Sequence, residues 1–244
     1  MTSPEVVRYG DLPDQFVHVH EAVGDEQGCV VSIHGGYWRA KYGLDLHDPI
    51  AEHLSARGWT VFNIEYRRVE ADGGPGVWAE MSSDVLDACS LTDGRSGPTM
   101  ALGHSAGGQL ALWAAAQPSA QIDAVIGLAP VSDLFLADGL ELSGHATKHL
   151  LGESASVRPD LYAVASPLYL LPLGVPQLVV HGHSDEDVPF EMTPEYIESA
   201  TAAGDDVALI DPKKVDHFHV IDPTHAVWRD IDAWMDDTRR TLDA

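Results

Sequence analysis

Short apolar runs alternate along the chain with longer stretches of helical spacing, and this alternation predicts most of the secondary structure. Runs such as 29–33 are continuous and β-branched, which is typical of strands buried on both faces of a parallel sheet. Stretches such as 48–57 place apolar residues on one helical face and end at a glycine. The predicted strands are 15–20, 29–33, 60–64, 99–102, 122–129, 177–181 and 207–210. The predicted helices are 48–57, 78–91, 109–117, 191–203 and 223–242.

The order of these elements indicates the fold class. Strands that alternate with helices favour an α/β fold, in which a mostly parallel sheet is covered by helices on both faces. The run 15–20 alternates apolar and polar residues, so we expect it to be an edge strand. Segment 133–165 is patchy, and we interpret it as small helices that form a lid over the strand ends. Residues 1–244 are therefore predicted to form a single domain with a lid insertion at about 133–165.

Composition narrows the classes of partner. The 244 residues include 14 basic and 38 acidic ones, for a formal net charge of −24. So acidic a surface disfavours nucleic acid and anionic membranes as partners. Cys29 and Cys89 each fall in a predicted buried element, so we interpret them as small core residues rather than a disulfide.

The chain shows no sign of a targeting segment. No basic stretch followed by an apolar one opens the sequence, and no apolar run approaches the length of a membrane span. We therefore expect a cytoplasmic protein with a small-molecule substrate. The oligomeric state is open, with a homodimer as one candidate.

The stretch 103–108 reads G-H-S-A-G-G and lies between a predicted strand and a predicted helix. A strand, then G-x-S-x-G, then a helix is the context in which this motif presents a nucleophilic serine. The turn is so tight that Gly103 and Gly107 must supply room beside Ser105. We expect the Ser105 hydroxyl to be held out above the sheet at a helix N-terminus, where negative charge is favoured.

A serine nucleophile needs a base, and the base needs an acid that holds its tautomer. After Ser105 the chain carries H-G-H-S-D-E-D-V-P at 181–189 and D-H-F-H-V at 216–220. Here the sequence resembles the α/β-hydrolase superfamily, whose acid loop often reads H-G-x-x-D-x-x-V-P and which places an H-F pair at the histidine. The resemblance implies Asp185 as the acid and His217 as the base. Asp187 and His219 stay open as alternatives, because spacing alone does not separate them.

Acyl transfer also needs N–H donors for the oxyanion that forms on the substrate carbonyl. One is expected from the backbone of Ala106, directly after the nucleophile. The loop after the strand 29–33 reads H-G-G-Y-W, where related lipases and esterases carry H-G-G-G. By position in that loop, the N–H groups of Gly36 and Tyr37 are the other candidates for the oxyanion hole.

The H-G-G-Y-W loop, together with E-Y-R-R at 65–68, resembles the kynurenine formamidase (arylformamidase) branch of these hydrolases and its small carboxylesterase relatives. The resemblance runs from about residue 28 to the C-terminus. It implies hydrolysis of a small ester or an N-formyl aryl amide through an acyl-Ser105 intermediate. Trp38, with Tyr37 and the segment 134–150, is expected to line an apolar substrate pocket.

The sequence also allows other interpretations of its histidines, its arginines and its function. The pairs His18/His20, His181/His183 and His217/His219 could each begin a metal site, but no His-Glu-x-x-His helix is present, and we expect neither a metal nor any other cofactor. Arg67 and Arg68 could bind a substrate carboxylate or form structural salt bridges with acids such as Glu65 or Asp84. A general short-chain carboxylesterase, an acyl-peptide hydrolase, and a non-catalytic binding protein on a hydrolase scaffold are the alternative functions.

Overall fold

The computed structural model describes residues 3–70 and 76–243, and its centre is an eight-stranded sheet. The strand order is β1-β2-β4-β3-β5-β6-β7-β8. β1 and β2 run antiparallel to their neighbours, and β4 through β8 pair in parallel. The strands are β1 (Glu5–Arg8), β2 (Phe16–His20), β3 (Gly28–Ile33), β4 (Trp59–Ile64), β5 (Thr99–His104), β6 (Ala124–Leu128), β7 (Gln177–Val180) and β8 (Val207–Ile210).

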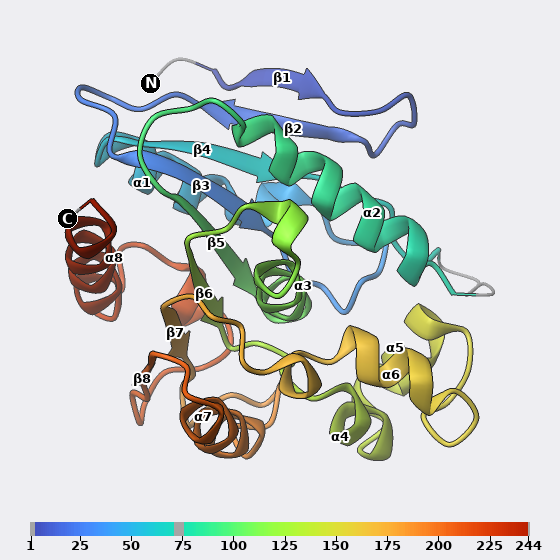
Figure 1. Ribbon diagram of the computed structural model, residues 1–244. Coiled ribbons are helices and arrows are strands. Elements are labelled where there is room, and N and C mark those ends of the chain that lie inside the picture. The colour runs from blue at the N-terminus through green and yellow to red at the C-terminus, as the bar shows by residue number, and fades with distance from the viewer. Residues whose placement is uncertain (1–2, 71–75, 244) are drawn as a thin grey trace.

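Helices cover both faces of this sheet, as Figure 1 shows. They are α1 (Asp48–Ala56), α2 (Trp78–Cys89), α3 (Ala106–Ala115), α4 (Leu134–Gly139), α5 (Leu142–Leu151), α6 (Pro159–Ala165), α7 (Met192–Ala203) and α8 (Trp228–Leu242). Buried residues of α1 and α8 form one apolar core with the strands, and those of α2, α3 and α7 form a second core on the other face. The predicted α/β class with two covered faces is confirmed.

The central strands explain why this order is stable. β3, β4, β5, β6 and β7 are buried at every position, so their apolar residues meet helices on both sides. Cys29 and Cys89 are free thiols in the core, as expected. Among the residues described, no helix is both long and apolar enough to cross a membrane.

The structure corrects two of these expectations, the place of one strand in the sheet and the start of the terminal helix. The run 15–20 is not an edge strand, because β1 pairs with its outer side; β1 is almost entirely exposed and so carries no apolar periodicity that reveals it. The terminal helix begins at Trp228 rather than at 223. There the Asp222 carboxylate accepts hydrogen bonds from the N–H and hydroxyl of Thr224, which holds a turn where the helix was expected to start.

The segment 133–165 does form small helices, α4, α5 and α6. It is attached to the core at several points. The side-chain amide of Gln109 on α3 donates to the Ala165 carbonyl at 2.8 Å, and the Trp113 indole donates to the Val164 carbonyl at 3.1 Å. The N–H of Leu134 donates to the Ser166 hydroxyl at 3.0 Å.

The chemistry-bearing loops lie at one edge of the sheet. Glu65 follows β4, His34 follows β3, Ser105 follows β5, and the loop that carries Asp185 follows β7. His217 follows β8 after a short loop. Because the carboxyl ends of parallel strands meet at the same edge, residues far apart in sequence come together there.

Candidate active site

Ser105 sits on a strained turn between β5 and α3. Its backbone has φ 56° and ψ −119°, a conformation that a residue with a side chain rarely adopts. Neighbouring backbone holds it there: its N–H donates to the Leu128 carbonyl at 2.8 Å, and its own carbonyl accepts from the N–H groups of Gln109 and Val131. The turn therefore presents the serine side chain at the N-terminus of α3.

The glycines beside Ser105 are required by close backbone contacts. A Cβ on Gly103 would lie 2.0 Å from the Gly107 carbonyl oxygen, and a Cβ on Gly107 would lie 2.0 Å from the Ile33 oxygen. The expectation that these two glycines make room for the turn is confirmed. Ser105 lies at the N-terminus of α3 as expected, is only 1% exposed and lines a small cavity.

His217 and Asp185 form a hydrogen-bonded pair. The Nδ1 of His217 lies 2.7 Å from Asp185 Oδ2, and the Asp185 side chain is completely buried. The other carboxylate oxygen accepts from the N–H groups of Asp187 and Val188 at 2.9 and 2.8 Å. Burial alone would raise the pKa of Asp185, but hydrogen bonds from His181, His217 and the Val188 N–H outweigh it and hold the pKa well below its usual range.

The two alternatives from the sequence lie elsewhere. Asp187 contributes its N–H to Asp185, and its carbonyl accepts from the Tyr37 hydroxyl. His219 pairs with Asp216 at 2.8 Å and is about half exposed. The structure thus brings His217 to Asp185 and leaves Asp187 and His219 outside the pair.

His104, the residue before the nucleophile, packs against His217 and is hydrogen-bonded to its backbone. Its Nε2 lies 2.9 Å from the His217 carbonyl, and the two rings are 4.4 Å apart. Burial, and after it the neighbouring His217 ring, hold the pKa of His104 well below its ordinary value. A neutral His104 must carry its proton on Nε2, because a carbonyl can only accept.

A cavity of about 60 Å³ joins the nucleophile to the histidine. Space of this size holds a few water molecules or a short acyl group. It is lined by Gly36, Tyr37, Tyr42, Leu46, His104, Ser105, Asp187, His217 and Phe218. Within the described residues no hydrogen bond joins Ser105 Oγ to His217, a contact that commonly tightens only when substrate binds.

The loop after β3 packs directly on the nucleophile turn. A Cβ on Gly35 would lie 2.7 Å from the His104 carbonyl oxygen and 3.0 Å from the Ser105 Cβ. In the described part of the chain, the N–H groups of Gly36, Tyr37 and Ala106 have no hydrogen-bond acceptor. Free N–H groups beside a serine nucleophile can bind an oxyanion.

Trp38 does not line this cavity, which corrects the expectation that it contacts substrate. Its side chain is fully buried, and its indole N–H donates to the Gln109 side chain at 2.9 Å. The backbone at Tyr37 and Trp38 has positive φ, 51° and 59°, so the chain reverses direction and sends Trp38 into the core. Tyr37 does line the cavity, as expected.

Three aromatic or apolar residues of the cavity were missed in the sequence. Tyr42 and Leu46 lie in the second half of the connection from β3 to α1, and Phe218 follows the histidine. The H-F pair pointed to Phe218, whereas no motif marked Tyr42 or Leu46. None of the residues that line this cavity comes from 133–165, so the predicted contribution of 134–150 to the pocket is absent from it.

The two arginines and the pairs His181/His183 and His217/His219 have structural partners. Arg67 forms an ion pair with the buried Asp84 at 2.7 Å, and Arg68 pairs with Glu65 at 3.0 Å, so the salt-bridge interpretation holds. His181 is hydrogen-bonded to Thr193 and lies 3.2 Å from Asp185. Within residues 3–70 and 76–243, no group of three or more His, Cys, Asp or Glu side chains has the arrangement of a metal site.

The chain matches one protein-family model and resembles several solved structures. The BD-FAE family model matches residues 17–199 of the chain. No curated protein matches the sequence.

Solved structures resemble the chain over nearly its whole length. The thermophilic esterase Est2 of the Planctomycetes species Thermogutta terrifontis superposes with a TM-score of 0.75 at 20% identity, covering 96% of this chain and 91% of that one. A truncated carbohydrate esterase from gut microbiota gives a TM-score of 0.79 at 17% identity over 98% and 96% of the two chains. An acetyl ester-xyloside bifunctional hydrolase from Caldicellulosiruptor lactoaceticus gives 0.77 at 17% over 96% of each chain. At these identities the likeness establishes the fold, which is the α/β-hydrolase fold.

Proposed function

Because the chain belongs to the BD-FAE family, we propose that it is a serine hydrolase that cleaves small carboxylic esters through an acyl-Ser105 intermediate. One observation carries the proposal: Ser105 and His217 face the same small cavity, and His217 is hydrogen-bonded to a buried, ionised Asp185. Ser105 is the nucleophile, His217 the base and Asp185 the acid that orients it. Est2 and the gut carbohydrate esterase, which share this fold, are esterases, and this supports the same reaction class.

Each residue has a defined step in this mechanism. Asp185 accepts from His217 Nδ1–H, so the Nε2 lone pair is available to take the proton of Ser105 Oγ as that oxygen attacks the ester carbonyl. The carbonyl oxygen becomes an oxyanion, which the N–H groups of Gly36, Tyr37 and Ala106 bind. His217 then gives the proton to the leaving alcohol. A water molecule, deprotonated by His217 in the same way, releases the acid from Ser105.

The cavity suits a short acyl group. About 60 Å³ of space beside Ser105 is enough for a small acyl group such as formyl or acetyl. Tyr37 and the half-exposed Phe218 border it and offer aromatic surface to the leaving group. An N-formyl aryl amide has the smallest acyl group and an aromatic leaving group, so arylformamidase activity is the second candidate.

A substrate series tests the proposal. Purified protein is assayed with p-nitrophenyl acetate, butyrate and octanoate and with N-formyl-L-kynurenine, each with and without a strong chelator. We expect kcat/KM to fall from acetate to octanoate and to be unaffected by the chelator, since the proposed mechanism needs no cofactor.

Ser105→Ala is the matched control, because it removes the nucleophile from a backbone that other contacts hold. We expect it to abolish turnover while the thermal unfolding midpoint changes little. Est2 has been captured phosphonylated by sarin, and a fluorophosphonate probe should likewise label Ser105 here. Faster cleavage of the formamide than of any ester would establish the arylformamidase. No turnover of any substrate and no labelling of Ser105 would refute the hydrolase and favour a binding protein on this scaffold.

A further inference from the structure

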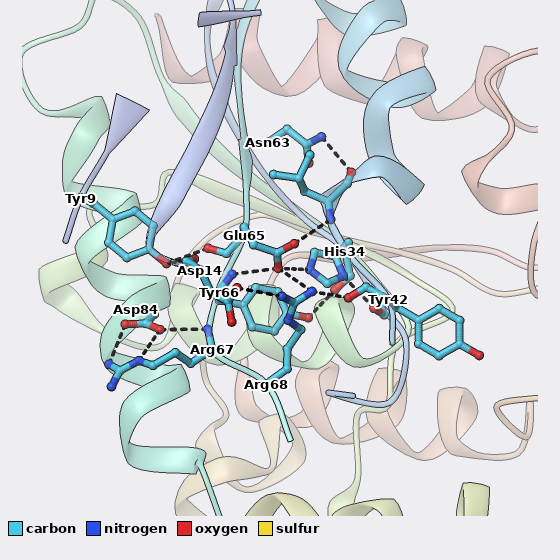
Figure 2. Close-up of polar contacts among 12 residues, drawn as sticks. Tyr9, Asp14, His34, Tyr42, Asn63, Glu65, Tyr66, Arg67, Arg68 and Asp84 are labelled. Carbon is cyan, nitrogen blue, oxygen red and sulfur yellow. Dashed lines mark hydrogen bonds and ion pairs between the residues drawn. The ribbon is translucent and has the colours of Figure 1, made fainter. Parts of the chain in front are cut away.

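A second histidine–carboxylate pair lies on the other side of Ser105, at the ends of β3 and β4. Figure 2 shows the Glu65 carboxylate joined to both His34 and Arg68, with the Arg67–Asp84 pair separate from it. His34 Nε2 lies 2.9 Å from Glu65 Oε1, and His34 is fully buried. The Tyr66 ring stacks on the His34 ring at 4.5 Å, and the Tyr66 hydroxyl donates to the His34 carbonyl.

Both ring nitrogens of His34 face groups that can only accept a hydrogen bond. Nδ1 lies 2.8 Å from the Gly35 carbonyl oxygen, and Nε2 faces the Glu65 carboxylate. A neutral imidazole has one N–H and one lone pair, so it can satisfy only one of these contacts. Both are satisfied only when His34 carries a proton on each nitrogen and a positive charge.

The surroundings of Glu65 keep its carboxylate ionised opposite this charge. Oε1 also lies 3.0 Å from Arg68 Nη1 and accepts from the Tyr66 N–H, and Oε2 accepts from the Leu44 N–H at 3.2 Å. Burial would raise the pKa of Glu65, but His34, Arg68 and the Tyr66 N–H together lower it. Arg68 has a second carboxylate partner, because its other terminal nitrogen lies 3.3 Å from Asp14.

The other titratable neighbour of His34, His47, carries no positive charge of its own beside Glu65. His47, at the connection to α1, is fully buried, and burial and the charge of His34 lower its pKa to about 3. His47 is therefore neutral at physiological pH. The groups that face His34 are thus the Glu65 anion, the Arg68 cation, neutral His47 and the Tyr66 ring. The Asp45 carboxylate lies near Glu65, since a Cβ on Gly43 would be 2.9 Å from Glu65 Oε2 and 3.1 Å from Asp45 Oδ1.

His34 controls the direction of a peptide next to the nucleophile. The Gly35–Gly36 peptide is planar and trans, so its carbonyl and its N–H point in opposite directions. Because His34 Nδ1–H holds the Gly35 carbonyl, it also fixes where the Gly36 N–H points. The same loop lies against Ser105, and Gly36 lines the cavity that Ser105 shares with His217.

We propose that Glu65 is a positioning residue for the oxyanion hole: it holds His34 as a doubly protonated imidazolium, and His34 in turn aims the Gly36 N–H at the substrate oxyanion. The fixed positive charge behind that peptide also favours the negative charge of the transition state. The inference rests on the proposed hydrolase function, since it assigns a residue to that reaction.

The test is Glu65→Gln, assayed with the best p-nitrophenyl ester. The amide has the same size as the carboxylate but no charge, so His34 loses the anion that keeps it protonated. We expect kcat to fall by about 10- to 100-fold, somewhat less than the loss of a whole oxyanion donor, with KM within about twofold. The pH profile should change as well. In the wild type Glu65 holds the charge on His34, whereas the variant lacks that anion, so its rate should depend on pH over a range in which the wild-type rate does not.

Asp84→Asn is the matched control. Asp84 is as deeply buried as Glu65, but it lies on α2 and not at the end of a strand. It pairs with Arg67 instead of Arg68. We expect this variant to lose thermal stability but to keep the wild-type kcat and pH profile. Equal losses of kcat in both variants, or an unchanged kcat and pH profile in Glu65→Gln, would overturn the positioning role.

A second measurement does not depend on a variant that folds. Nitrogen-15 spectra of the wild-type histidine rings distinguish an imidazolium from either neutral tautomer, and His34 should show two protonated nitrogens, because each of its ring nitrogens faces an acceptor. A neutral His34 would overturn the inference even if the protein is an active hydrolase. A wild-type protein that neither turns over substrate nor labels at Ser105 would instead refute the proposed function, and the positioning role with it.

Discussion

Two histidine–carboxylate pairs flank Ser105, and they are built alike. In each, a carboxylate follows a parallel strand, is almost completely buried, and accepts backbone N–H groups as well as a histidine. Asp185 and His217 form one pair at 2.7 Å, and Glu65 and His34 form the other at 2.9 Å. The carboxylate and the burial therefore do not decide what either pair can do.

The difference lies in the second nitrogen of each ring. In His34 it is bonded to the Gly35 carbonyl, so both nitrogens are occupied and the ring cannot exchange a proton without breaking a contact. In His217 only Nδ1 has a partner among the described residues, and the ring borders the cavity. One arrangement suits proton transfer and the other suits fixing a loop, and contact with a cavity separates them.

The largest effect should follow from Asp185→Asn. Two backbone N–H groups bind one oxygen of Asp185, so the asparagine oxygen must stay with them and its NH₂ must face His217. His217 Nδ1 then has to accept, and its proton moves to Nε2, where the base must be free. We expect kcat to fall by about 10³- to 10⁴-fold, as for the equivalent change in serine proteases.

Steady-state kinetics with p-nitrophenyl acetate measures this loss, and Asp187→Asn is its control. The Asp187 side chain pairs with no histidine, and its contacts to Asp185 and Tyr37 use only the backbone. Asp187 borders the cavity, but its backbone contacts remain in the variant, so kcat should fall far less than in Asp185→Asn, by no more than about threefold. If Asp187→Asn were the more damaging change, the acid would have been assigned to the wrong residue.

A smaller loss of kcat is expected when the Gly36 N–H, whose direction the His34 pair fixes, is displaced by a substitution at Gly36 itself. Gly36 has φ 111°, and a Cβ there would lie 2.5 Å from the Tyr42 side chain. Gly36→Ala must therefore shift the loop, and we expect kcat to fall by about 10²-fold, the cost of one oxyanion donor.

Gly174→Ala separates this effect from backbone strain in general. Gly174 also has a positive φ, 76°, but nothing lies within 4 Å of the Cβ it would gain, and it is outside the site. It should lose some stability and keep its kcat. A Gly36→Ala enzyme with normal kcat would show that the Gly36 N–H is not an oxyanion donor.

These residues also show which parts of the site a sequence can predict. Ser105, Gly103 and Gly107 are adjacent in the chain, and the tight turn they form is a local property, so a short motif is enough to identify it. The alternation of strands and helices likewise predicted the sheet, because buried parallel strands are continuous apolar runs. Exposed β1 lacks that pattern and was missed.

The parts that were missed depend on contacts between distant segments. Trp38 was expected in the pocket because it belongs to the H-G-G-Y-W motif, but the positive φ angles of the loop turn it into the core, and residue type does not reveal such angles. His34 and Glu65 stand in two separate motifs, and their pairing depends on β3 and β4 being neighbours in register. Tyr42 reaches the cavity only because Gly36 leaves room for its ring.

The smallest effect should come from Tyr37, which links the loop of the His34 pair to the loop of the His217 pair. Tyr37 belongs to the loop that His34 holds, and its hydroxyl donates to the Asp187 carbonyl in the loop of Asp185. Tyr37→Phe removes this bond but keeps the ring against the cavity, and because Asp187 is exposed, water can replace the lost donor. We expect a loss of about 0.5–1 kcal/mol in unfolding free energy by urea titration, and about a 2- to 5-fold lower kcat/KM. A loss as large as that of Gly36→Ala would mean that the two loops are not held independently, and that the His34 and His217 pairs act as one unit through Tyr37.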